Sequence, residues 1–272
     1  MSNVHNRLPS ASLENELPLV TVVTVVFNGA QFLEETIKSV VSQTYPNIEY
    51  IIIDGGSTDG TLEIIRKYEY AIDYWVSEKD DGIYDAMNKG IRLASGQWIN
   101  FMNAGDSLDF DVSILCAYNA TNIPLVYGDA IVIDNKGKIS YRSGRAVTKA
   151  DFFDSMPICH QAIFYSKQFI APYDTRYKII SDRVMTYALM KNELKPQYNN
   201  CIQVKYLEGG MSYSNYNKRA REEVSFLRET NRLTLISFIK IHFLIYVKAP
   251  LYNYVNNTAC LRALYIKFKR CL

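Results

Sequence analysis

Residues 50–61 read Tyr-Ile-Ile-Ile-Asp-Gly-Gly-Ser-Thr-Asp-Gly-Thr, an apolar strand that runs directly into a polar, glycine-containing turn. Residues 20–28 (Val-Thr-Val-Val-Thr-Val-Val-Phe-Asn) and 98–106 (Trp-Ile-Asn-Phe-Met-Asn-Ala-Gly-Asp) repeat this pattern, and the polar segment 80–90 leads to the last of the three strands. Open α/β sheets bind ligands just beyond the carboxyl ends of their strands. The stretch 19–109 therefore predicts one continuous ligand site.

Predicted helices alternate with these strands. The spacing of apolar residues predicts helices near 30–43, 60–69 and 84–94 and strands at 20–26, 49–53, 74–76 and 98–102. This alternation predicts an α/β fold with a mostly parallel, Rossmann-like central sheet flanked by helices. The second half is less regular, with predicted strands at 125–127 and 130–133, a helix near 181–191 and a helical tail from about 217.

Length and composition limit the domain organisation. With 272 residues, 48% of them hydrophobic, the chain can build one sizeable core with an appendage. We expect a disordered leader over 1–17, a main domain over 18–215 and a helical tail over 216–272. The main domain divides into halves at 18–109 and 110–215. No apolar signal segment and no run of 18 uncharged apolar residues is present, so neither a secretory signal nor a transmembrane helix is expected.

The five cysteines are odd in number and show no paired metal-ligand spacing. This pattern predicts free thiols in a reducing compartment, hence a cytoplasmic protein, without a zinc site.

Asp54 ends a predicted strand and is followed by Gly55 and Gly56. Because glycine lacks a Cβ, a flat base could lie against the backbone there. Helix capping by the residues 57–59 is the alternative interpretation, but capping alone requires neither Asp54 nor both glycines.

Two further carboxylates are candidates for chemistry. Asp106 ends the motif 103–106, and a divalent cation on a diphosphate needs only one or two protein oxygens; a simple Asp-containing turn is the alternative. Asp182 begins a predicted helix and could act as a general base, although an acid there also favours the helix dipole. His160 lies beside an apolar strand, where a core role is the alternative to a role in binding.

These motifs, taken in order, resemble the family-2 inverting glycosyltransferases with a GT-A fold, especially bacterial enzymes that build surface polysaccharides such as colanic acid, O-antigen and capsule. The resemblance covers about 18–212. It is strongest at 24–28, 54–61 and 81–90, and continues through 103–106, His160-Gln161 and 209–212.

The resemblance implies a role for each candidate residue. Asn28 would line the nucleotide pocket, Asp54 would hydrogen-bond the base above Gly56, and Asp106 would bind Mg²⁺ or Mn²⁺. Asp182 matches the family's catalytic base, and His160 a recurrent residue near the acceptor. The residues expected to line the ribose, diphosphate or donor sugar are Asp85, Asn88 and Lys89.

Three departures from the family pattern stand out. There is no proline near Val26, and Ala104 and Gly105 occupy the earlier acidic positions of the DxD-type motif, so that Asn103 is left as a neutral substitute ligand. The segment that matches the family's catalytic base reads Ser-Asp-Arg-Val at 181–184. It lacks the second acid of the sequence Ala-Asp-Tyr-Asp that the family often has there.

The tail is basic. From residue 230 onward there is no Asp or Glu, and seven Lys or Arg side chains are interleaved with aromatic residues. This composition favours a helix that lies at the surface of an anionic membrane, which would make the protein peripheral at the inner face of the cytoplasmic membrane. Packing of the tail on the domain, or a homodimer interface, is the alternative.

We therefore expect a metal-dependent inverting glycosyltransferase. It would transfer a hexose or N-acetylhexosamine from a nucleoside-diphosphate donor, most simply UDP-linked, to a polyprenyl-diphosphate-linked saccharide, with no nucleic-acid partner. A sugar-phosphate nucleotidyltransferase would need basic residues in the loop 27–31, which has none. The remaining alternative is a catalytically degenerate glycosyltransferase-like protein that binds nucleotide sugar or serves as a scaffold.

Overall fold

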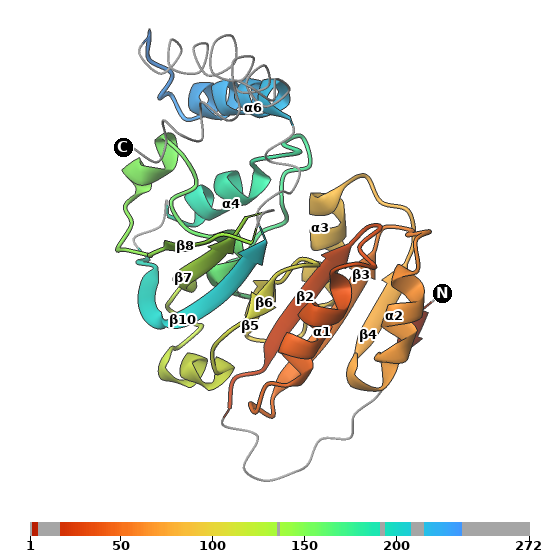
Figure 1. Cartoon of the computed structure of the whole chain (residues 1–272). Coiled ribbons are helices and arrows are strands. Elements are labelled where there is room, and N and C mark those ends of the chain that lie inside the picture. Colours follow the sequence, from red (N-terminus) through yellow and green to blue (C-terminus); the bar gives the residue numbers. More distant parts are fainter. Residues whose placement is uncertain (1, 5–16, 135–136, 191–193, 208–214, 236–272) are drawn as a thin grey trace. The chain divides into compact units, whose positions relative to one another are not determined.

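The computed structural model describes residues 2–4, 17–134, 137–190, 194–207 and 215–235 (Figure 1). The chain divides into two units, Met1–Gly209 and Gly210–Leu272. In the second unit the structure describes helix α6 (Tyr216–Glu229), part of the predicted helical tail. All the candidate site residues belong to the first unit, which is described below.

The first unit is built on one mixed sheet, whose strands follow the order β1-β4-β3-β2-β5-β9-β7-β10-β6, with β8 paired to β7. Strands β4, β3, β2 and β5 are mutually parallel, as are β7 and β10, whereas β9 is antiparallel to both β5 and β7. The predicted α/β class is confirmed; the larger group of parallel strands lies in the first half, and β7 and β10 form a second parallel pair. The strands are β1 (Ser2–Val4), β2 (Val20–Val26), β3 (Ile48–Asp54), β4 (Tyr74–Ser77), β5 (Trp98–Phe101), β6 (Ser107–Leu108), β7 (Leu125–Ile133), β8 (Ile139–Arg142), β9 (Ile163–Ser166) and β10 (Gln197–Leu207).

The helices and short 3₁₀ segments connect these strands. The α-helices of the unit are α1 (Leu33–Val41), α2 (Thr61–Lys67), α3 (Ile83–Leu93) and α4 (Ser181–Leu189). The 3₁₀ segments are η2 (Glu69–Ala71), η3 (Val112–Ala117), η4 (Lys149–Phe153) and η5 (His160–Ala162).

Strand β2 is buried along its whole length because helices cover both of its faces. On one face α1 buries Leu33, Ile37 and Val40, at the spacing of a helix stripe, in the same core cluster as Val22. On the other face α3 packs close to β2 through Gly90, where a Cβ would meet Val23 Cγ1 at 2.4 Å. Burial of each such aliphatic side chain stabilises the fold by about 1.5–3 kcal/mol. This close packing sets the position of α3, which carries several candidate site residues.

Two parts of the structure differ from the sequence-based expectation. Residues 2–4, expected in a disordered leader, form β1 and pair with β4, because the backbone of an edge strand accepts a partner whatever its side chains. Residues 197–207, for which no strand was predicted, form β10, which pairs with β7. The two strands approach so closely that a Cβ on Gly128 would meet Ile202 O at 2.2 Å.

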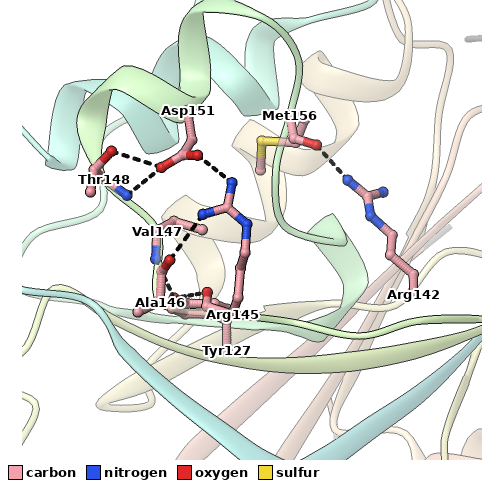
Figure 2. Close-up of polar contacts among 8 residues, drawn as sticks. All are labelled: Tyr127, Arg142, Arg145, Ala146, Val147, Thr148, Asp151 and Met156. Carbon is pink, nitrogen blue, oxygen red and sulfur yellow. Dashed lines mark hydrogen bonds and ion pairs between the residues drawn. The ribbon is translucent and has the colours of Figure 1, made fainter.

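The segment 142–156, which runs from the end of β8 through η4, is fixed by polar contacts (Figure 2). The buried Tyr127 hydroxyl donates to Arg145 O at 2.8 Å and accepts from Val147 N at 3.2 Å. Asp151 accepts from Thr148 N and Thr148 Oγ1, each at 2.7 Å, and pairs with the Arg145 guanidinium, which lowers the pKa of Asp151. A strand at the core of the second half thus anchors a loop on its surface.

Candidate functional site

Asp54 organises the turn at the end of β3. Its side chain is fully buried, and Oδ2 accepts from Gly56 N (3.1 Å), Ser57 N (2.9 Å) and Ser77 Oγ (2.6 Å), while Oδ1 accepts from Ser57 Oγ. Gly56 has a φ of 84°, a conformation that favours glycine. Direct contact between Asp54 and a nucleotide base would therefore require one of these hydrogen bonds to be exchanged.

Asn28 connects the turn after β2 to the turn after β3. Its backbone N donates to Ser57 Oγ at 2.7 Å, and its Oδ1 accepts from Thr58 N at 2.9 Å. Its φ of 49° lies in the left-handed region, which asparagine tolerates better than most residues. Asn28 therefore lies at the carboxyl edge of the sheet, where the sequence predicted it, and couples the two loops there.

The same edge carries two side chains to which the sequence analysis gave no role. Phe27, directly after β2, is 65% exposed, although a ring of this size is ordinarily buried. A Cβ placed on Gly55 would meet Phe27 Cδ2 at 3.4 Å and Asp80 Oδ2 at 2.6 Å. An exposed aromatic ring and a carboxylate thus flank the glycine turn. The signal in the sequence was an aromatic residue immediately after a buried strand.

Helix α3 carries Asp85, Asn88 and Lys89. Lys89 Nζ lies 2.9 Å from Glu78 Oε1 and 3.8 Å from Asp85 Oδ2, at the end of β4. Asn88 is buried, and its amide donates to Tyr173 O at 2.9 Å and accepts from Tyr173 N at 2.7 Å. Both polar atoms of the Asn88 side chain already form hydrogen bonds within the protein. A contact with the nucleotide-sugar substrate would therefore use the second lone pair of the amide oxygen or the second hydrogen of the amide nitrogen.

Asp106 is almost completely buried at the turn after β5. Its Oδ1 accepts from Leu207 N at 3.0 Å, and the Gln161 side chain also hydrogen-bonds the carboxylate. Burial raises the pKa of Asp106 to about 7, although both hydrogen bonds oppose the shift. On the same turn, Asn103 Oδ1 is buried and has no hydrogen-bond partner among the described residues.

A second cluster joins the beginning of α4 to α3. Asp182 Oδ1 accepts from the Tyr84 hydroxyl at 2.9 Å, and the Tyr84 and Tyr173 ring centroids lie 5.3 Å apart. His160 Nε2 hydrogen-bonds the Tyr173 hydroxyl at 2.8 Å, and its ring stacks on Phe101. Burial lowers the pKa of His160, partly offset by the Asp182 charge.

The structure therefore brings the candidate residues into two groups joined by α3. One group, at the carboxyl ends of β2–β5, comprises Asn28, Asp54, Gly56, Asp85, Lys89, Asn103 and Asp106. The other comprises Asp182 and His160, and Asn88 of α3 is joined to it through Tyr173. Tyr84 of α3 and Tyr173 connect this second group to α3. Sequence reasoning gave neither tyrosine a role, because their contacts are made between segments far apart in the chain.

The family follows from comparison with known sequences. The sequence profile described as Glycosyl transferase family 2 matches residues 21–198. A PGL/p-HBAD biosynthesis glycosyltransferase of Mycobacterium bovis is 33% identical over 208 residues, which cover 72% of this chain and 79% of that protein. TuaG of Bacillus subtilis is 33% identical over 135 residues, 45% of this chain and 53% of that protein. The chain belongs to glycosyl transferase family 2 and is a glycosyltransferase.

Solved structures share the fold. The mannosyltransferase PcManGT of Pyrobaculum calidifontis, in complex with GDP-Man and Mn²⁺, has a TM-score of 0.60 at 17% identity, over 94% of this chain and 80% of that one. TarS of S. aureus, in complex with UDP-GlcNAc, has a TM-score of 0.58 at 15% identity, over 84% of this chain and 73% of that one. The predicted GT-A fold is confirmed.

In the part of the chain that the structure describes, none of the helices has the length and apolar character of a membrane span. Most of the basic segment 230–272 lies outside the described residues, which end at 235. Over the described ranges, no group of three or more His, Cys, Asp or Glu side chains could hold a metal ion.

Proposed function

We propose that this glycosyltransferase transfers a sugar, with inversion, from a UDP-sugar to a hydroxyl of a lipid-linked saccharide. The observation that carries the proposal is the position of Asp182. This carboxylate lies in the first turn of α4 and is joined to α3, whose other residues reach the nucleotide edge of the sheet. Among the described residues, Asp182 Oδ2 has no hydrogen bond that would block a substrate hydroxyl.

The reaction that fits this arrangement is a direct displacement. Asp182 takes the proton of the acceptor hydroxyl, whose oxygen forms a bond to the anomeric carbon. The bond from that carbon to the diphosphate breaks on the opposite side, and the electron pair leaves with the diphosphate. An α-linked donor therefore gives a β-linked product.

The donor would bind at the carboxyl ends of β2–β4. The exposed Phe27 ring offers a flat apolar surface to the base, and Gly56 lets the base approach the backbone. Asp54 holds this turn in shape, and Asn28 ties it to β2. Lys89 can place its positive charge toward the diphosphate, with Asp85 and Glu78 orienting its ammonium group.

Mg²⁺ or Mn²⁺ would be held by Asp106, with Asn103 Oδ1 as a neutral oxygen ligand. Asn103 Oδ1 is buried without a hydrogen-bond partner among the described residues, and a cation would give it one. Burial raises the pKa of Asp106, and a bound cation would offset this desolvation by stabilising the ionised carboxylate. The described side chains supply too few ligands alone, so the donor diphosphate would complete the set. When bound, the cation stabilises the charge of the departing diphosphate.

The relatives support a role in building bacterial surface saccharides, since TuaG is named for teichuronic acid biosynthesis and the mycobacterial relative for PGL/p-HBAD biosynthesis. A lipid-linked acceptor would agree with a peripheral location at the inner face of the cytoplasmic membrane through the basic segment 230–272. A catalytically degenerate nucleotide-sugar-binding protein remains the second candidate, because Ala104 and Gly105 replace acids in the metal motif.

The test is a transfer assay with purified full-length protein, a set of nucleotide sugars and lipid-linked acceptors extracted from bacterial membranes, with Mn²⁺ and with EDTA. Metal-dependent transfer, with the opposite anomeric configuration in the product by NMR, is the expected result. Nucleotide binding without any transfer above a heat-killed control would favour the degenerate protein. Transfer with retained configuration would contradict direct displacement.

A further inference from the structure

Tyr84 connects the nucleotide half of the site to the proposed base. It lies in the first turn of α3 and is buried, with its hydroxyl oxygen 2.9 Å from Asp182 Oδ1 and 3.0 Å from the backbone oxygen of Ile179. A tyrosine hydroxyl has one hydrogen to donate and two lone pairs to accept with. It therefore faces two acceptors with a single proton.

The hydrogen bond from Tyr84 can persist in both protonation states of Asp182. When the carboxylate is ionised, the strongest bond that Tyr84 can make is donation to Oδ1, because that acceptor is charged. Once Oδ2 has taken the proton of the acceptor hydroxyl, Oδ1 is a neutral carbonyl oxygen that still accepts from Tyr84, and Ile179 O is an acceptor of the same kind. The phenol hydrogen therefore has an acceptor in both states, but its bond to Asp182 is stronger in the ionised state.

We propose that Tyr84 is a positioning residue that holds Asp182 in one place through both halves of the proton transfer. This inference rests on the proposed function, because it assigns Tyr84 a task only if Asp182 is the base. This role does not require Tyr84 to touch the donor or the reacting atoms. It acts on the orientation of Asp182 and on the relative stability of its ionised form.

The ring of Tyr84 is well placed for this task. It packs against Tyr173, whose backbone is held by Asn88 of α3, one helical turn beyond Tyr84 itself. The hydroxyl is therefore fixed to the same helix that carries Lys89 and Asp85.

The other titratable groups that face Asp182 stay neutral near pH 7. They are His160 on η5, Tyr165 on β9 and Tyr173 before α4. Burial lowers the pKa of His160 and raises the pKa of Tyr165 and of Tyr173. None of these three groups therefore changes its charge beside Asp182 near pH 7. Asp106 does protonate in this range, so every assay is run at saturating Mn²⁺, which keeps Asp106 ionised.

The experiment compares the pH dependence of kcat/KM for the wild type and for Tyr84→Phe, with Tyr50→Phe as a matched control. Tyr50 is an equally buried tyrosine whose hydroxyl bonds Thr24 in the core, away from the site. Loss of the hydrogen bond to ionised Asp182 should move the acidic limb about one pH unit upward and lower kcat about tenfold, with the donor KM unchanged. Tyr50→Phe should leave the limb in place.

A second substitution tests the same role if Tyr84→Phe fails to fold. Replacement of Tyr84 by 3,5-difluorotyrosine keeps the ring and hydroxyl but makes the phenol a stronger donor, so the acidic limb should move downward. An unmoved limb in both variants, with Asp182→Asn inactive, would overturn the role of Tyr84 alone. Activity retained in Asp182→Asn would instead overturn the proposed base, whatever Tyr84 does.

Discussion

Asn88 of α3 holds the backbone of Tyr173 from both sides, with its amide nitrogen 2.9 Å from Tyr173 O and its amide oxygen 2.7 Å from Tyr173 N. These residues are 85 positions apart in the chain. The pair joins a helix of the nucleotide half to the segment that leads into α4. Together with the Tyr84–Asp182 hydrogen bond, it fixes the position of Asp182 relative to α3.

Asn88→Ala should be strongly destabilising. Removal of the amide leaves a buried N–H and a buried carbonyl of Tyr173 without their partner, at a cost of about 2–4 kcal/mol in the free energy of unfolding. Urea unfolding measures the change. Asn122→Ala, at an exposed position, should change stability by less than about 0.5 kcal/mol. A similarly small loss of stability in both variants would contradict the structural role of the Asn88–Tyr173 hydrogen bonds.

The packing of α3 on β2 makes a second prediction. Gly90→Ala places a methyl group against Val23 and should destabilise the protein by about 1–3 kcal/mol. Val23→Ala alone should also destabilise, through a cavity. In the double variant the new methyl fills part of that cavity, so the loss should be clearly smaller than the sum of the two. Additive losses in urea unfolding would show that the two residues do not share this contact.

Asp106→Asn should exchange function for stability. Because burial raises the pKa of Asp106 to about 7, the protonated form favours folding, and this contribution is lost as pH rises from about 4 through 7. Without metal, the stability of the variant relative to the wild type should therefore be about 2–3 kcal/mol greater at pH 8 than at pH 5. Thermal unfolding at the two pH values measures this.

Mn²⁺ provides the companion measurement. In the presence of UDP, Mn²⁺ should raise the melting temperature of the wild type, more at pH 8 than at pH 6, where protons compete for Asp106. It should do little for Asp106→Asn. Equal metal-induced shifts in both proteins would remove Asp106 from the proposed metal site.

Phe27→Ala should weaken nucleotide binding without unfolding the protein. The ring is largely exposed, so its loss costs the fold little, whereas loss of a stacking surface should reduce affinity for UDP about five- to tenfold. Tyr70, an aromatic residue that is 71% exposed at η2, serves as the control. Calorimetric titration with UDP should show the loss in Phe27→Ala and not in Tyr70→Ala.

Local sequence pattern was sufficient for the nucleotide half. Residues 20–26 and 50–53 are runs of β-branched and aromatic residues, and α1 has its buried residues at helix spacing, so each element follows from its own residues. Strand β10 was not predicted. Its first five residues, Gln-Tyr-Asn-Asn-Cys, carry no strand pattern, and this part joins the sheet through its pairing with β7. Residues 202–206 (Ile-Gln-Val-Lys-Tyr) do alternate apolar and polar side chains, a strand signal that was overlooked.

The candidate site likewise has residues that local sequence pattern reveals and residues that it does not. The carboxylates at the ends of strands are visible in the sequence because a motif follows a strand. The roles of Tyr84, Tyr173 and Asn88 depend on contacts between segments about 85–98 positions apart, which no local pattern encodes. Asp54 and Asp106 are where the sequence predicted them, but their burial could be known only from the packing of the loops around them.

The most direct test of the central claim is the behaviour of Asp182→Asn, measured as sugar transfer and as UDP-sugar binding in the same preparation. The amide is nearly isosteric but cannot accept the proton of the acceptor hydroxyl. We predict transfer at least about a thousandfold below the wild type, with donor affinity within about threefold. Transfer close to the wild-type rate would contradict the assignment of Asp182 as the base.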